Sequence, residues 1–189
     1  MAMGMKKKIV IGVAAIFAII IVLGVIGSNS SNSTTQNTGT LITESVDQML
    51  PTRAEIPTEF TIDETKNLIL NVSGFESGKM VSTSKLEGTT GMIFVDYSVY
   101  KFSTAEDAKS YYDNKINEIK QEGGYTEIRI SGCFTYKVDM GFEGESGESF
   151  CMKDNVVYSS YVTSSKTYRQ IDSFMKDATN LLEGKVKTR

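Results

Sequence analysis

The sequence predicts an α+β protein: an N-terminal transmembrane helix followed by one domain whose mainly antiparallel sheet is packed by two longer helices. Three observations lead to this prediction. Residues 9–27 are apolar throughout and directly follow three lysines. Beyond residue 40, helical periodicity is strong in two stretches, 103–122 and 164–183. The remaining strand-like segments come in runs rather than alternating strictly with helices, which is typical of an antiparallel α+β sheet.

The membrane prediction depends on the stretch IVIGVAAIFAIIIVLGVIG, residues 9–27, which contains no charged side chain. A helix of this length is about 28 Å long, close to the thickness of the hydrocarbon core. Lys6, Lys7 and Lys8 precede it, and the next basic residue is Arg53. The positive-inside rule therefore places residues 1–8 in the cytoplasm and the C-terminal domain outside the cell membrane. We predict a single-pass signal anchor.

Cleavage as a signal peptide is the alternative to a retained anchor, and it would make the protein secreted. The apolar run is longer than the usual 7–15 residues of such a peptide. Nevertheless, residues 25–27 precede Ser28 with side chains that a signal peptidase could accept. Within the run, Ala14 and Ala18 form a small-xxx-small pair on which a partner helix could pack.

Residues 28–40 read SNSSNSTTQNTGT and contain no charge and no large apolar side chain. Such a segment cannot offset its own ordering entropy, so it is predicted to be a flexible linker. Asn29, Asn32 and Asn71 each begin an N-x-S/T triplet, which is a glycosylation acceptor if the host modifies exported proteins.

Composition excludes several classes of function for the outer domain, residues 41–189. Removing the three N-terminal lysines from the 20 basic residues leaves 17, against 23 acidic ones, which argues against nucleic-acid binding. The chain has no histidine, so triad catalysis and histidine-ligated metal sites are excluded. We therefore expect no enzyme and no catalytic, cofactor-binding or metal residues.

The first part of the outer domain is predicted to begin with a short helix over 43–50, ended by Pro51. Asp63 is an acceptable N-cap for a second short helix through Leu70 that Gly74 closes, and a strand over 68–72 fits nearly as well. In the helical interpretation, three side chains point inward: Leu68, Ile69 and Val72.

Two antiparallel strands are then expected at 78–86 and 92–102, joined by a glycine-containing turn. On the second strand, alternation separates two sides. One carries Phe94, Asp96, Ser98 and Tyr100. The other side is apolar and should face the core; it carries Ile93, Val95, Tyr97 and Val99.

The first long helix starts with a predicted capping box, Ser103 to Glu106, and ends at Gly123-Gly124. Its expected buried stripe is Ala108, Tyr111, Tyr112, Ile116 and Ile119. The last helix is expected to start at Ser164 or Ser165 and to end at Gly184, with 185–189 as a frayed basic tail. Its stripe is Tyr168, Ile171, Phe174, Met175, Ala178, Leu181 and Leu182.

Between the helices, strands are expected at 125–130, 133–140, 149–152 and 155–163, with Asp154-Asn155 as a tight turn. The loop 139–148 carries four carboxylates, Asp139, Glu143, Glu145 and Glu148. Oxygen ligands on such a loop could bind Ca²⁺. Because the spacing lacks the D-x-D-x-D-G core of a calcium loop, we predict a solvated hairpin tip.

Cys133 and Cys151 are the only cysteines, and export would place them where disulfides persist. The two strands around them turn near Phe142, which leaves equal arms on either side. In a non-hydrogen-bonded antiparallel pair the Cα atoms are about 4.5 Å apart, and disulfides span about 4.4–6.8 Å. We therefore predict a disulfide, with two free thiols as the alternative.

These features favour a membrane-anchored extracytoplasmic domain that serves as a binding or interaction module of the cell envelope, with an unknown protein or envelope partner. The alternative is a structural or assembly subunit that docks to a larger membrane complex through its transmembrane helix. The two hypotheses place the functional surface differently: on the outer domain in the first, and on the Ala14–Ala18 helix face in the second.

Overall fold

The structure is a computed structural model that describes residues 41–87, 91–141, 144–165 and 171–187. The predicted membrane segment 9–27 and linker 28–40 lie outside the described residues. Among the residues that are described, no helix combines the length and hydropathy of a membrane span. The chain divides into units 1–37 and 38–189, and only the second is described below.

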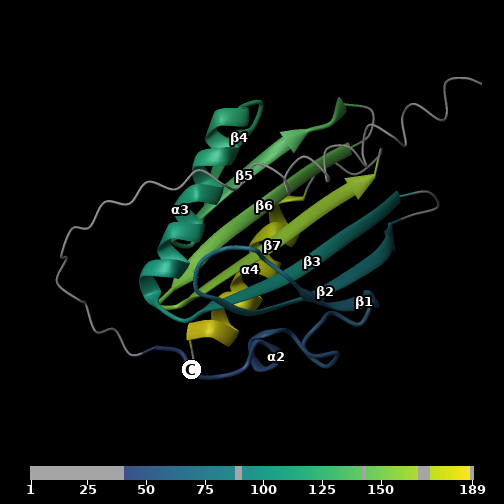
Figure 1. The fold of residues 1–189 in the computed structure, drawn as a ribbon. Helices are drawn as coiled ribbons and strands as arrows, with labels where there is room; N and C mark the ends of the chain where they lie inside the picture. The colour runs from purple at the N-terminus through teal and green to yellow at the C-terminus, as the bar shows by residue number, and fades with distance from the viewer. Residues whose placement is uncertain (1–40, 88–90, 142–143, 166–170, 188–189) are drawn as a thin grey trace, which may run out of the picture. The chain divides into compact units, whose positions relative to one another are not determined.

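Within the described ranges, seven strands form one antiparallel sheet in the order β1-β2-β3-β7-β6-β5-β4 (Figure 1). The strands are β1 (Thr61–Leu68), β2 (Phe75–Glu87), β3 (Gly91–Phe102), β4 (Thr126–Ile130), β5 (Cys133–Asp139), β6 (Gly144–Lys153) and β7 (Val156–Ser165). The chain leaves the sheet after β3, re-enters at the far edge and returns inward, so that β7 pairs with β3. This confirms the predicted α+β class.

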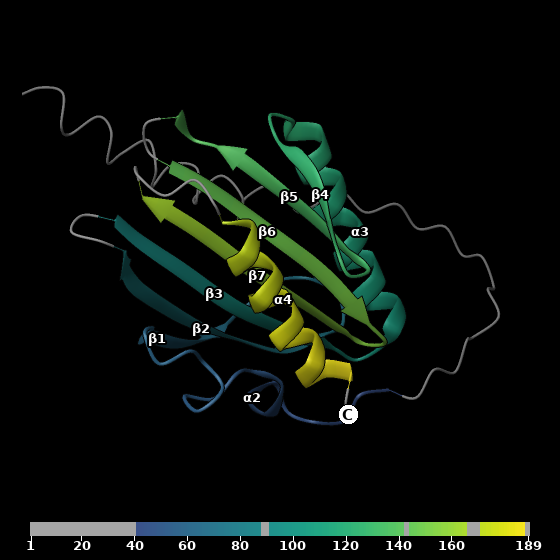
Figure 2. The same cartoon turned by 180° about the vertical axis from the view of Figure 1, so that it is seen from behind.

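The two long helices pack on opposite faces of this sheet. Figure 1 shows α3 (Ala105–Glu122) in front of the strands, and the reverse view in Figure 2 shows α4 (Asp172–Lys187) in front. The one-turn helix α2 (Val46–Met49) lies against α4, near the predicted 43–50. The two faces are called the α3 face and the α4 face below.

The α4 face carries the main hydrophobic core. It contains the apolar side of β3 that the alternation predicted, together with residues of β7 and α4. Fully buried members include Ile93, Val99, Val156, Val162, Ile171, Met175 and Leu182. Gly147 on β6 lies under Met175: an added Cβ would come within 2.5 Å of the Met175 sulfur and within 2.8 Å of the Tyr136 carbonyl oxygen, and the backbone oxygen cannot easily give way, so the position favours glycine.

A second, smaller cluster lies between α3 and the other face. Its buried members are Phe102, Ala108, Tyr111, Phe150 and Val157. The remaining residues of the predicted α3 stripe, Tyr112, Ile116 and Ile119, are only half-buried. The helix ends as predicted at Gly123, whose φ of 65° favours glycine.

The predicted helix from Asp63 to Leu70 is wrong, because those residues mostly belong to β1. The alternative strand over 68–72 is also misplaced, since β1 ends at Leu68. Ile69 is 90% exposed and Val72 45% exposed, so neither points inward. β1 is an edge strand that owes its conformation to pairing with β2, and its charged residues keep the free edge soluble.

The starts of both long helices also differ from the predictions. The N-cap of α3 is Thr104, whose hydroxyl accepts a hydrogen bond from the Asp107 amide, so the Ser103–Glu106 box is wrong by one residue. β7 runs to Ser165, which rules out a helix start at Ser164 or Ser165. Residues 166–170, including Tyr168, lie outside the described chain.

The last helix does not end at Gly184 but continues to Lys187. Val186 is fully buried, and the Lys185 ammonium lies 2.9 Å from both carboxylate oxygens of Glu55. Packing and this ion pair therefore hold residues that the sequence suggested would fray.

The Cys133–Cys151 disulfide is present, with the Cα atoms 4.5 Å apart as the hairpin register predicted. At the same end of β6, the turn before β7 places Asn155 in the interior. Its side chain bonds the Ile42 amide at 2.8 Å and the Phe102 carbonyl at 2.8 Å. The turn residue thus ties the start of the domain to the end of β3.

Candidate functional site

A continuous row of polar side chains crosses the α3 face. Registered strand pairs place seven residues side by side: Glu127, Tyr136, Glu148, Tyr161, Asp96, Ser82 and Glu64, from β4 to β1. Directly opposite residues on antiparallel strands have Cβ atoms about 4.5–5.5 Å apart, so each member contacts its neighbours. We call these seven residues the polar row.

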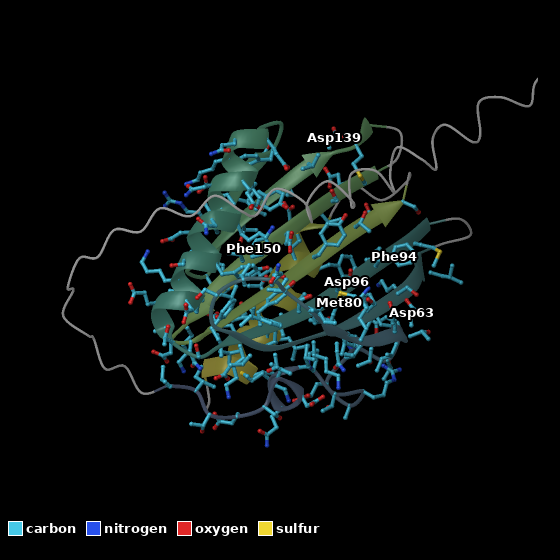
Figure 3. All side chains as sticks on the ribbon, in the orientation of Figure 1. Asp63, Met80, Phe94, Asp96, Asp139 and Phe150 are labelled. Carbon is cyan, nitrogen blue, oxygen red and sulfur yellow. A yellow bond between two sulfur atoms is a disulfide. The ribbon has the colours of Figure 1, made fainter. Side chains whose placement is uncertain are left out.

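The polar row lies at the border of the sheet surface that α3 covers. The helix packs over β6, β7 and β3, above the cluster that contains Phe102 and Phe150. In Figure 3, Phe150 lies beside the helix, whereas Asp96, Met80 and Phe94 lie over strands away from it. Phe94 is 38% exposed. The row therefore has an apolar cluster on one side and an accessible sheet surface on the other.

Glu148 is the most perturbed carboxyl group of the row. It is half-buried between two tyrosines, and the Tyr136 hydroxyl donates a hydrogen bond to it at 3.2 Å. Burial raises the pKa of Glu148 to about 7, although hydrogen bonds from Ser159 and Tyr136 and the charge of Lys115 on α3 oppose the shift. Glu148 thus changes charge near neutral pH.

The pKa of Asp96, two strands away, is shifted in the same direction. Burial raises its pKa, a hydrogen bond from Ser82 and the charge of Lys66 oppose the rise, and Glu64 and Asp63 add to it. Between the two carboxyl groups, burial also raises the pKa of Tyr161, so its phenol stays protonated. The row therefore alternates carboxyl and hydroxyl groups in a partly dry environment.

Such a row can accept and donate several hydrogen bonds to one ligand. Carboxyl groups whose pKa is shifted by burial and by a neighbouring charge are typical of functional sites. The described residues contain no group of three or more acidic or cysteine side chains arranged to hold a metal ion. The arrangement suits a ligand that presents hydrogen-bond donors.

The local sequence pattern does not predict this row. Glu148 was expected in a hairpin tip, but β6 starts at Gly144, so Glu145 and Glu148 are strand residues on opposite sides of the sheet. Glu143 lies outside the described residues, and Asp139 is exposed at the end of β5. The one available signal was Asp96 in an otherwise apolar strand; the cross-strand partners could not be read without the register.

Comparisons with known proteins identify the fold and leave the family open. No protein-family model matches the chain, and no curated protein matches it. Among solved structures, the domain resembles the extracellular domain of PknH from Mycobacterium tuberculosis, with a TM-score of 0.57 and 13% sequence identity. The match covers 75% of this chain and 95% of that one. At this identity the likeness shows a shared fold.

Proposed function

We propose that this protein is a membrane-anchored extracytoplasmic binding module whose polar row binds a ligand bearing ammonium and hydroxyl groups. One observation carries the binding role: Glu148 is half-buried between hydroxyl groups, in a row that lies next to sheet surface that no helix of the described ranges covers. An ionised carboxyl group that is partly buried lowers the stability of the fold unless a partner compensates its charge. A cationic ligand supplies that partner, and its hydroxyls match the phenols on either side.

The placement outside the membrane has separate support. The lysine triplet before residues 9–27 favours a cytoplasmic N-terminus. The disulfide fits an oxidising compartment, and the similar fold in PknH belongs to an extracellular domain. Carbonate extraction and protease treatment of intact cells test the placement. A soluble protein with a new N-terminus near Ser28 would favour the signal-peptide alternative.

Ligand binding is tested on the full chain in zwitterionic nanodiscs by titration calorimetry. N-methylglucamine is the cationic polyol probe, and sorbitol is its neutral counterpart. We expect N-methylglucamine to bind more tightly and its affinity to rise as the pH increases through about 7, because ionised Glu148 is the binding form. Equal affinity for both probes, or no saturable binding, would contradict the proposal.

Two variants locate the binding. Glu148→Gln should lower the affinity for N-methylglucamine and abolish its pH dependence, since the amide carries no charge. Glu106→Gln changes an exposed carboxylate on α3 and should leave binding unchanged. If the two variants bind alike, the polar row is not the site.

The assembly hypothesis is tested by affinity capture from detergent with the full chain and with residues 41–189. Partners that residues 41–189 retain favour the binding module. Partners lost with residues 9–27, and lost again when Ala14 and Ala18 are replaced by leucine, would favour docking through the transmembrane helix.

A further inference from the structure

A cavity lies on the opposite side of the sheet from the polar row. It has a volume of about 440 Å³ and opens between α4, β3 and the segment after α2 (the elements on the α4 side in Figure 2). This volume is within the range of about 300–1,000 Å³ for small-molecule sites. Val95 and Tyr97 line it while Asp96, between them in sequence, belongs to the row. The two sites therefore share a strand but no side chain.

The cavity has apolar walls. Phe60 and Phe174 are packed edge to face with centroids 6.2 Å apart, and Leu181 and Ala178 of α4 extend this surface. The ammonium group of Lys85 lies 5.3 Å from the Phe60 centroid and 4.7 Å from that of Phe174. This contact holds the rings in place and shows that they tolerate a positive charge nearby.

Carboxylates surround the opening. Glu55 is bound to Lys185, and that hydrogen bond lowers the pKa of Glu55 to about 2, so it is ionised and already compensated. Glu59 and Asp177 are exposed at the cavity and have no ion-pair partner among the described residues. The opening therefore carries three carboxylates against the two ammonium groups of Lys85 and Lys185, which leaves a small excess of negative charge.

Tyr97 adds a hydroxyl group to the wall of the cavity. The side chain is only 4% exposed and lines the cavity, and its hydroxyl has no hydrogen-bond partner within the described part of the chain. Burial, and then the charge of Asp177, raises the pKa of Tyr97 to about 12, so the carboxylate lies within electrostatic range of the hydroxyl. Among the described residues the only fully buried side-chain polar atom without a partner is Glu145 Oε2, so the Tyr97 hydroxyl is in contact with solvent and is open to a hydrogen bond from a molecule in the cavity.

We propose that this cavity is a second binding site, specific for a small amphipathic primary amine. The ammonium group donates hydrogen bonds to Asp177 and to the phenol oxygen of Tyr97, with Glu59 adding long-range attraction. The apolar body of the ligand packs against Phe60, Phe174 and Leu181. A neutral molecule of the same shape would gain only the apolar part of this binding.

The test compares phenethylamine with 2-phenylethanol, which has the same aromatic body without the charge. Binding is measured by titration calorimetry on the full chain in zwitterionic nanodiscs, with empty nanodiscs to subtract partitioning. We expect phenethylamine to bind roughly tenfold more tightly, the effect of one charge-assisted hydrogen bond. Equal affinities, or no saturable binding of the amine, would overturn the proposal.

Matched variants locate this site independently of the polar row. Asp177→Asn should weaken phenethylamine binding roughly fivefold to tenfold and leave 2-phenylethanol unchanged. Tyr97→Phe should weaken phenethylamine binding by a smaller factor, and both variants should keep the wild-type circular dichroism spectrum.

The matching controls are Asp113→Asn on α3 and Tyr125→Phe before β4, which lie outside both the cavity and the polar row and should bind both probes like the wild type. The polar row is measured separately with N-methylglucamine, so failure of the polar-row site and failure of this one are distinguishable. If phenethylamine binds and neither Asp177→Asn nor Tyr97→Phe weakens it, the amine occupies another place and the proposal fails.

Discussion

The two faces of the sheet differ in how they treat polar groups. On the α4 face two pairs of buried hydroxyls are satisfied within the protein: Ser160 with Thr179 at 2.9 Å, and Thr135 with Ser149 at 3.1 Å. On the α3 face, partly buried carboxyl groups keep raised pKa values beside sheet surface that no described helix covers. The main core on the α4 face thus supplies most of the stability, while the α3 face holds carboxyl groups whose burial costs stability.

The largest effect is expected for Leu182→Ala on the α4 face. Leu182 is fully buried in the main core, so the substitution should lower the free energy of unfolding by about 3–5 kcal/mol. Urea denaturation of residues 41–189, followed by circular dichroism, measures it. If Leu182→Ala lowered the free energy of unfolding by less than a substitution on the α3 face does, the α4 face would not be the main source of stability.

Replacing both cysteines by serine should cost about 3 kcal/mol in the chain-entropy model, because the bridge closes a loop with a sequence separation of 18. The same denaturation experiment measures it. Adding a reductant to the wild type should reproduce the loss, whereas the double serine variant should not respond to the reductant. A wild type that is insensitive to reduction would show that the bridge adds little stability.

Glu148→Gln sharpens the comparison through pH. Burial raises the pKa of Glu148 from 4.5 to about 7 in the folded protein, so between these values the folded state binds more protons than the unfolded state. The wild type therefore loses stability as pH rises through this window. The glutamine variant lacks this loss and should be more stable than the wild type by about 3 kcal/mol at pH 8.

The check is a series of denaturation curves from pH 4 to pH 8. The two proteins should converge at the acidic end, where Glu148 is protonated in both states. A wild type that gains stability relative to the variant as pH rises would mean that Glu148 is stabilised as the carboxylate.

The smallest effect is expected for Ile119→Ala on α3. Ile119 is half-buried at the edge of the smaller cluster, so the loss should be about 1 kcal/mol. Tyr111 is 9% exposed and its ring centroid lies 5.3 Å from that of Phe102, so Tyr111→Ala should lower the free energy of unfolding by about 2–4 kcal/mol. If Ile119→Ala and Tyr111→Ala lowered the free energy of unfolding equally, Ile119 would be more deeply buried than its exposed fraction indicates.

Strong local patterns predicted much of the fold. The alternation along β3 identified its core side, and the α4 periodicity identified Met175 and Leu182 as buried. Equal arms around one turn were enough to pair Cys133 with Cys151. These predictions depended on residues close together in the chain, where the strand and helix periods are visible directly.

Neither candidate site could be predicted in this way. The polar row joins residues from Glu64 to Tyr161 that become neighbours only when seven strands pair in register. The cavity joins Phe60, Tyr97 and Asp177 from three separate segments. Each residue alone looks like an ordinary surface carboxylate or core aromatic, because burial and partners, rather than residue type, give it its chemistry.

The sequence by itself determined the class of the domain, its two amphipathic helices, the apolar side of β3 and the disulfide, because each depends on local spacing. Only the tertiary structure decided that β1 is a strand, since its hydrogen bonds come from β2 and its own residues favour a helix as readily. The tertiary structure also decided that α3 and α4 lie on opposite faces. Because α3 is the only long helix on its face and covers only part of the sheet there, Glu148 and Asp96 are left partly exposed within the described structure.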